Sequence, residues 1–203
     1  MTEIRKEHVE WRVVDRLREI LEQPMETPHD VTLIYSLFST ILCWTCQRLR
    51  DDAAGEHKAI WQKISMQRAS ADPWHFDIGK AKEVRHPTEA AVDAQLLPAG
   101  RFLIGIRNAI AHGDHTRIEP RHNEVSPGRP DRRLVGFSFT TDFVQTRRDE
   151  DGRQIIVKDW GGWKLDLNNM DMRRIGLSLA NRFCDGLGRD SQDDATKHIE
   201  ISA

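Results

Sequence analysis

Residues 99–113 constrain the fold more than any other stretch of the chain, because an apolar segment there ends abruptly in polar residues and a glycine. Its large apolar residues recur at intervals of three and four, which places them on one face of a helix: Phe102, Leu103, Ile106 and Ile110. Proline suits the start of a helix, and glycine suits the left-handed position after its last turn. Pro98 and Gly113 therefore predict where this helix begins and ends.

The polar residues arrive together in the last turns of this predicted helix. Asn108 and His112 are four residues apart and so share a face. Arg107 lies about 140° around the helix from His112, at roughly 100° per residue, and reaches that face through its long side chain. Asp114 follows closely and is placed to support a charged imidazole. Because arginine binds phosphate oxygens through a rigid fork and histidine transfers protons near neutral pH, this group predicts phosphate chemistry.

The pattern Arg107-Asn108-x-x-x-His112, followed by Gly113-Asp114 on an apolar helix, resembles the RNxxxH signature of the HEPN domain superfamily. The match covers about residues 99–114. The resemblance implies a small helical domain, many relatives of which are metal-independent endoribonucleases of toxin–antitoxin, phage-defence and CRISPR-effector systems. It also implies RNA as substrate and a homodimer in which both motifs face one cleft. No cofactor is expected, and in some systems a separate nucleotidyltransferase-like antitoxin is the partner.

If the chain is such a ribonuclease, the expected catalytic residues are the four polar ones of the motif: Arg107, Asn108, His112 and Asp114. A second Arg-x4-His match occurs at Arg117 and His122, but it contains Pro120 and lacks an apolar helical run. We therefore expect it to have no role in catalysis.

Two other interpretations of the motif remain open. In the first, the chain is a non-catalytic HEPN-like module for dimerisation or for binding nucleotides or a partner protein, and Arg107 and His112 hold the dimer together. In the second, His112 and His115 bind a metal for hydrolysis. This pair has no carboxylate at a familiar ligand spacing, which disfavours the metal site.

The net charge of −2 gives no overall signature of a nucleic-acid-binding protein, so an RNA-binding surface has to be a local patch. The segment 116–133, rich in Pro, Gly, Arg and His, is predicted to be a loop after the motif helix. Its arginines are candidates for contacts to the phosphate backbone: Arg117, Arg121, Arg129, Arg132 and Arg133. The alternative is an ordinary solvated loop.

The hydropathy pattern predicts a mainly α fold, a HEPN-like helical bundle with a β-hairpin inserted after the motif helix. The hairpin is expected at about 133–165, in a single domain over 1–190 followed by a polar tail at 191–203. The helices are expected at about 3–22, 28–51, 54–66, 99–112 and 168–187, with a short one through about residue 95. A loop at 72–76 is expected to cover the core with its aromatic residues, or else to stack RNA bases.

The sequence contains three cysteines, too few for a disulfide framework. It has no apolar run long enough to span a membrane and no signal peptide, so a cytoplasmic location is expected. Cys43 and Cys46 form a C-x-x-C pattern in the middle of a predicted helix. Because thiolates are stabilised at helix N-termini and a zinc site needs further ligands, we expect these two cysteines to be structural.

Overall fold

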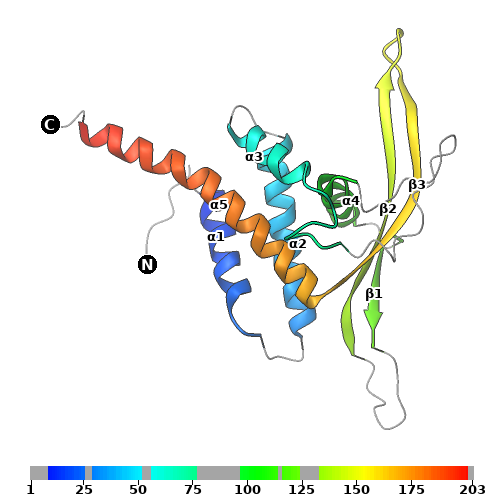
Figure 1. The fold of residues 1–203 in the computed structure, drawn as a ribbon, viewed down its shortest axis with the longest axis horizontal. Coiled ribbons are helices and arrows are strands. Elements are labelled where there is room, and N and C mark those ends of the chain that lie inside the picture. The colour runs from blue at the N-terminus through cyan, green and yellow to red at the C-terminus, as the bar shows by residue number, and fades with distance from the viewer. Residues whose placement is uncertain are drawn as a thin grey trace. The chain divides into compact units, whose positions relative to one another are not determined.

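The computed structural model describes residues 9–25, 29–51, 56–76, 97–113, 116–123 and 133–200. Within these residues the chain is mostly helical, with one small antiparallel sheet (Figure 1). The chain divides into two compact units, a helical unit (Met1–Ile64 with Met172–Ala203) and a sheet unit (Ser65–Asp171). The mainly α class is therefore confirmed, and each unit has a hydrophobic core of its own.

The helical unit is built from helices that bury one face each. Val14 and Leu21 of the first helix are fully buried. Gly176 lets the last helix approach closely, since a Cβ atom there would lie 2.9 Å from Leu21 Cδ2 and 3.8 Å from Phe38 Cα. The helices are α1 (Val9–Glu22), α2 (Asp30–Cys46, continued by a π-helical turn over Gln47–Asp51), α3 (Glu56–Ser65) and α5 (Asn169–Glu200).

The last helix is longer than predicted. The sequence predicts an end at about residue 187, but α5 continues to Glu200, so the predicted tail at 191–203 is helical over most of its length. The reason is packing: a Cβ atom at Gly186 would lie 2.2 Å from Ile60 Cδ1. Glycine here allows α3 and α5 to approach, which outweighs its cost of about 1 kcal/mol inside a helix.

Asn168 and Asp171 cap the start of α5 with two hydrogen bonds. The side chain of Asn168 accepts a hydrogen bond from the backbone N–H of Asp171 at 2.9 Å. The carboxylate of Asp171 accepts one from the backbone N–H of Asn168 at 3.2 Å. This reciprocal pair is a capping box, which satisfies two donors at the helix N-terminus.

All three cysteines are free, and each lies on a helix of the helical unit. Cys46 and Cys184 are buried, whereas Cys43 is half-buried. Burial raises the pKa of the Cys184 thiol to about 12, from an ordinary value of 9.0. The thiol is therefore neutral at physiological pH, and neutral thiols are poor nucleophiles.

We expect iodoacetamide at pH 8 to modify Cys43 first in the native protein and to leave Cys184 unmodified until the chain unfolds. Deprotonation of Cys184 requires pH values approaching 12, whereas the thiol of an unfolded chain ionises near 9. Mass spectrometry of samples taken at successive times measures the order in which the cysteines are alkylated. A urea-unfolded sample is the control. Alkylation of Cys184 at the unfolded rate in native protein would contradict this prediction.

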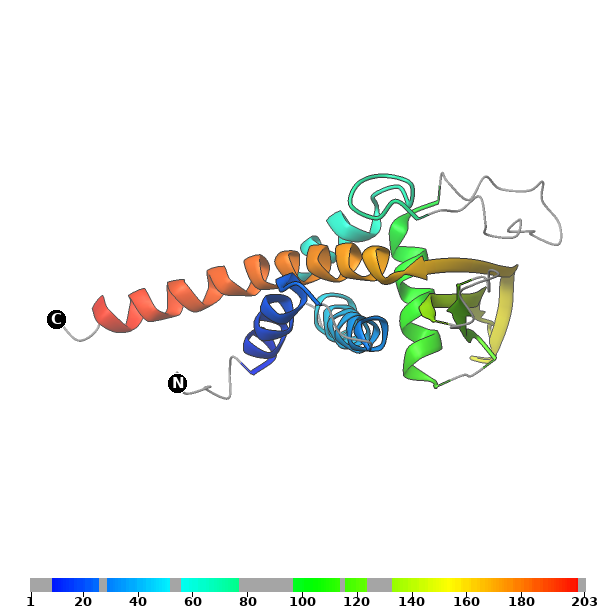
Figure 2. The same cartoon turned by 90° about the horizontal axis from the view of Figure 1, so that it is seen from below.

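The sheet unit holds the motif helix against a three-stranded antiparallel sheet with strand order β1-β2-β3. Its long hairpin was predicted at about 133–165 and is confirmed, with β2 running beside β3 (Figure 1). The motif helix α4 packs on β2, as Figure 2 shows from below. The elements are α4 (Ala99–Ala111), β1 (Ile118–His122), β2 (Leu134–Arg148) and β3 (Gln154–Asn168).

The prediction of a loop over 116–133 is wrong for residues 118–122, which form β1 at the edge of the sheet. Ile118 pairs with Phe139 and Pro120 with Phe137. A proline has no N–H to donate and is tolerated in an edge strand, so its presence did not exclude a strand. This result also confirms that the second Arg-x4-His match, at Arg117 and His122, is not helical.

The aromatic loop before the motif helix belongs to the core of the sheet unit, as predicted. Trp74 is fully buried and donates a hydrogen bond from Nε1 to Gln67 Oε1 at 2.8 Å. Phe76 stacks on Trp74 and meets Phe102 of α4, with ring centroids 5.5 Å apart. Because Trp74 and Phe76 are buried, these two rings do not form an exposed platform for stacking RNA bases.

Some predictions concern parts of the chain outside the described residues. These parts include the start of the first helix at 3–8, the short helix expected near 88–95, and the motif residue Asp114. Among the helices that the structure describes, none combines the length and the apolar character needed to cross a membrane.

Candidate functional site

Arg107, Asn108 and His112 lie at the C-terminal end of α4, where the helix stops as the sequence predicts. The backbone N–H of His112 donates to the carbonyl of Asn108 at 3.0 Å, and that of Gly113 donates to the carbonyl of Ile110 at 3.0 Å. Gly113 has a φ of +58°, in the left-handed region that glycine adopts without strain. His112 is therefore the C-cap residue, held by the end of the helix itself.

The apolar face of α4 fixes the direction of the polar face. Phe102, Leu103 and Ile106 are fully buried. At the start of the helix, a Cβ atom on Gly100 would lie 2.4 Å from Ser65 Cβ, so α4 is packed tightly there as well. With the apolar stripe fixed in this way, Arg107 and Asn108 are half-buried and His112 is exposed.

The side chain of Arg107 is held by its neighbour. Its Nη1 atom donates a hydrogen bond to Asn108 Oδ1 at 3.0 Å. Asn108 shares a helix face with His112, so this bond draws the guanidinium toward the histidine side of α4. In the structure the amide oxygen of Asn108 therefore positions Arg107.

The arginines proposed for RNA contacts have different surroundings. Arg121 lies on β1, and its Nε atom is 3.4 Å from Asp166 Oδ2 on β3. Asp166 also accepts a hydrogen bond from the Ser138 hydroxyl at 2.5 Å. The charge of Arg121 is thus compensated within the sheet, which makes it a poorer phosphate ligand than the sequence predicted.

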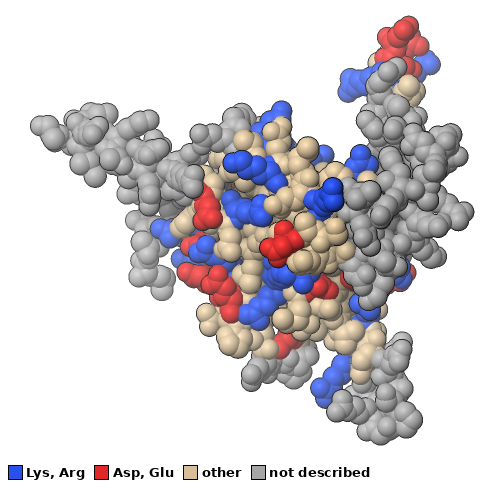
Figure 3. Space-filling view, in the orientation of Figure 1, with Lys and Arg blue, Asp and Glu red and all other residues tan. Residues whose placement is uncertain are grey.

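Arg117 is half-buried and Arg133 is exposed, whereas Arg129 and Arg132 lie outside the described residues. The backbone N–H of Arg133 donates to Asn123 Oδ1 at 2.6 Å, and the N–H of Asn123 donates to the carbonyl of Arg133 at 3.0 Å. These two bonds tie residues 123 and 133 together at the base of the intervening segment. On the face of the molecule in Figure 3, basic and acidic side chains are interspersed, in keeping with a net charge of −2.

A metal site at the motif would need ligands besides His112. His115, the second histidine of that interpretation, lies outside the described residues. Within the described part of the chain, no group of three or more His, Cys, Asp or Glu residues is placed to hold a metal ion. The chemistry that the described motif residues can supply is proton transfer by imidazole and anion binding by guanidinium.

The sequence did not indicate two groups of side chains that the fold brings together. One is the Arg121–Asp166–Ser138 network across the sheet. The other lies between α3 and α5 and is considered separately below. Comparisons with protein-family models, with curated proteins and with solved structures give no match to this chain.

Proposed function

We propose that this chain is a metal-independent endoribonuclease of HEPN type that acts as a homodimer. The observation that carries the proposal is the end of α4, where an exposed His112 follows an Arg107 that Asn108 holds at 3.0 Å. This is the residue set of the RNxxxH signature, on a helix that ends at the motif. A cytoplasmic setting in toxin–antitoxin or phage defence, with an antitoxin as partner, is part of the same proposal.

In the proposed reaction the ribose 2′-OH attacks the adjacent phosphorus. The P–O2′ bond forms and the P–O5′ bond breaks, which leaves a 2′,3′-cyclic phosphate and a 5′-OH. One His112 takes the proton from the 2′-OH, and the His112 of the second copy gives a proton to the departing 5′ oxygen. Arg107 stabilises the charge that develops on the phosphorane oxygens, and Asn108 positions Arg107 for this task.

We expect purified protein to cut RNA in the presence of EDTA and to leave 2′,3′-cyclic phosphate ends. The motif supplies proton transfer and charge stabilisation from side chains alone, so chelation should not change the rate. Mass spectrometry of the products identifies the ends. A matched oligonucleotide with 2′-deoxyribose at the cleaved position is the control and should stay intact, because it lacks the attacking hydroxyl. Loss of cleavage on chelation, or cleavage of the deoxy control, would overturn this mechanism.

We also expect a dimer in solution, because one histidine cannot easily act as base and acid in the same step and two-fold dimers are the commonest oligomers. Analytical ultracentrifugation at micromolar concentration measures the mass. The specific activity should fall on dilution in parallel with the fraction of dimer. Full activity at a concentration where the protein is monomeric would contradict a composite site.

The second candidate function is a non-catalytic HEPN-like module. The observation in its favour is that Arg107 is half-buried and bonded to Asn108, as expected of a structural residue. On this hypothesis the wild type cuts no RNA, and His112→Ala weakens the dimer instead. Sedimentation of this variant beside the RNA assay separates the two candidates.

A further inference from the structure

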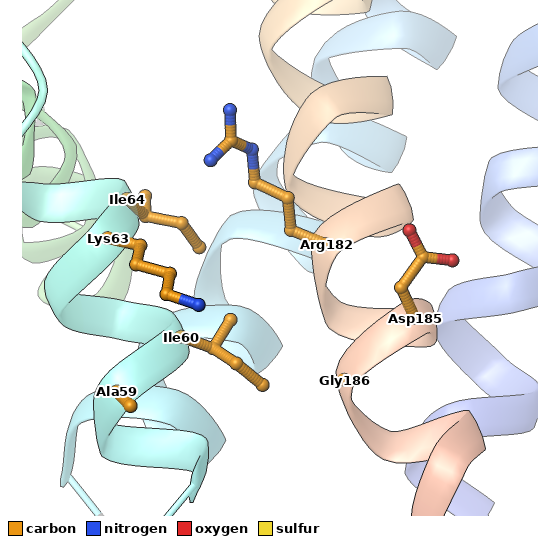
Figure 4. Close-up of a pocket in the computed structure, with 7 residues that line it drawn as sticks. All are labelled: Ala59, Ile60, Lys63, Ile64, Arg182, Asp185 and Gly186. Carbon is orange, nitrogen blue, oxygen red and sulfur yellow. The ribbon is translucent and has the colours of Figure 1, made fainter.

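A cleft between α3 and α5 of the helical unit has a volume of about 460 Å³. The two helices run in opposite directions along it: Ile64 and Arg182 lie at one end, and Ala59 and Gly186 at the other (Figure 4). Among the motif residues that the structure describes, none lines it. The lining residues are Ala59, Ile60, Lys63, Ile64, Arg182, Asp185 and Gly186.

The sequence accounts for the shape of this cleft. At one end Gly186 has no side chain, and the atom Ile60 Cδ1 occupies the space that a Cβ atom would need. The helices are close at that point. Arg182 lies four residues before Gly186, so it lines the same face of α5 one turn closer to the N-terminus of that helix.

The lining combines apolar surface with charges of both signs. Ile60 is half-buried and supplies apolar surface, whereas Ile64 is fully buried and offers none to a ligand. In Figure 4 the Lys63 side chain extends from α3 across the space toward α5. With Arg182 it gives two positive charges against the single carboxylate of Asp185, so the lining has a net charge of +1.

We propose that this cleft binds a small molecule that has an apolar body and one anionic group, a phosphate or a carboxylate. Small-molecule sites have volumes of about 300–1,000 Å³ and combine apolar walls with a few polar groups. The ammonium of Lys63 and the guanidinium of Arg182 bind the anionic group, since both are donors for charge-assisted hydrogen bonds. Ile60, which is half-buried, contacts the apolar body. The proposal does not depend on the ribonuclease function.

Isothermal titration calorimetry on the full chain tests the proposal with four probes. Phenyl phosphate and benzoate carry both features, whereas inorganic phosphate has only the charge and phenol only the apolar ring. We expect phenyl phosphate or benzoate to bind at least about tenfold more tightly than inorganic phosphate and phenol. The ratio of the dissociation constants of phenyl phosphate and benzoate shows which anionic group the cleft prefers.

Four variants locate the binding. Lys63→Met should weaken it about tenfold by removing a charged hydrogen-bond donor. Asp185→Asn should tighten it several-fold, since a carboxylate that repels the anion is lost. Ala59→Phe should block the cleft without a change of charge. Lys58→Met is the matched control, because Lys58 is exposed on the same helix and does not line the cleft.

Two results would overturn the proposal. One is the absence of binding of both phenyl phosphate and benzoate at millimolar concentration. The other is binding that neither Lys63→Met nor Ala59→Phe changes, which would place the ligand elsewhere on the protein. Circular dichroism of each variant verifies that the helices are retained.

Discussion

Replacement of His112 by alanine is expected to lower the rate of RNA cleavage about 10²–10⁴-fold, the usual loss when a general acid–base group is removed. The fold should be retained, because the imidazole is exposed. The residue's structural contact, the hydrogen bond from its backbone N–H to the carbonyl of Asn108, remains available to alanine. Initial rates on a fluorescent RNA, with thermal unfolding of both proteins, measure the two effects separately.

The matched control is His122→Ala. His122 is also exposed and also follows an arginine at the same spacing, but it lies on the edge strand β1. We expect this variant to cut RNA at the wild-type rate. Equal activity of wild type and His112→Ala would exclude the proposed proton transfer. Equal losses in both variants would show that the assay reports overall charge or RNA affinity and not catalysis at the motif.

Local sequence patterns predicted the helices well, because the residues that make a segment helical lie within that segment. The stripe of Phe102, Leu103 and Ile106 is a property of one helix and is buried as expected. The positions of the motif residues were predictable for the same reason: spacing fixes the face on which Asn108 and His112 lie, and Gly113 fixes where the helix stops.

Features that depend on contacts between distant segments were missed. Strand β1 has a composition typical of a loop, and its pairing with β2 makes it a strand. Gly186 has the pattern of a helix end, but contact with Ile60 on another helix explains it better. The cleft lined by Lys63, Arg182 and Asp185 likewise could not be predicted from the sequence, since only the packing of α3 on α5 brings these residues together.

Gly136→Ala is expected to destabilise the protein by about 3 kcal/mol or more, at the upper end of the range for overpacked sites. Gly136 is buried in the middle strand and pairs with Arg121 on one side and Asn168 on the other. A Cβ atom there would lie 2.2 Å from the carbonyl oxygen of Leu167 and 2.9 Å from Asn168 Cα. Both are backbone atoms, so no side chain can move aside, and the strands must separate.

Urea unfolding followed by tryptophan fluorescence measures the decrease in the free energy of unfolding. Gly152→Ala is the control. Gly152 has a φ of +77° in the hairpin turn and open space around it, so alanine there should cost only about 1–2 kcal/mol of left-handed strain. Because α4 packs on β2, Gly136→Ala should also reduce RNA cleavage at temperatures where the sheet loosens, whereas Gly152→Ala should not. Equal stability of the two variants would mean that β2 and β3 accept a methyl group at Gly136 without separating.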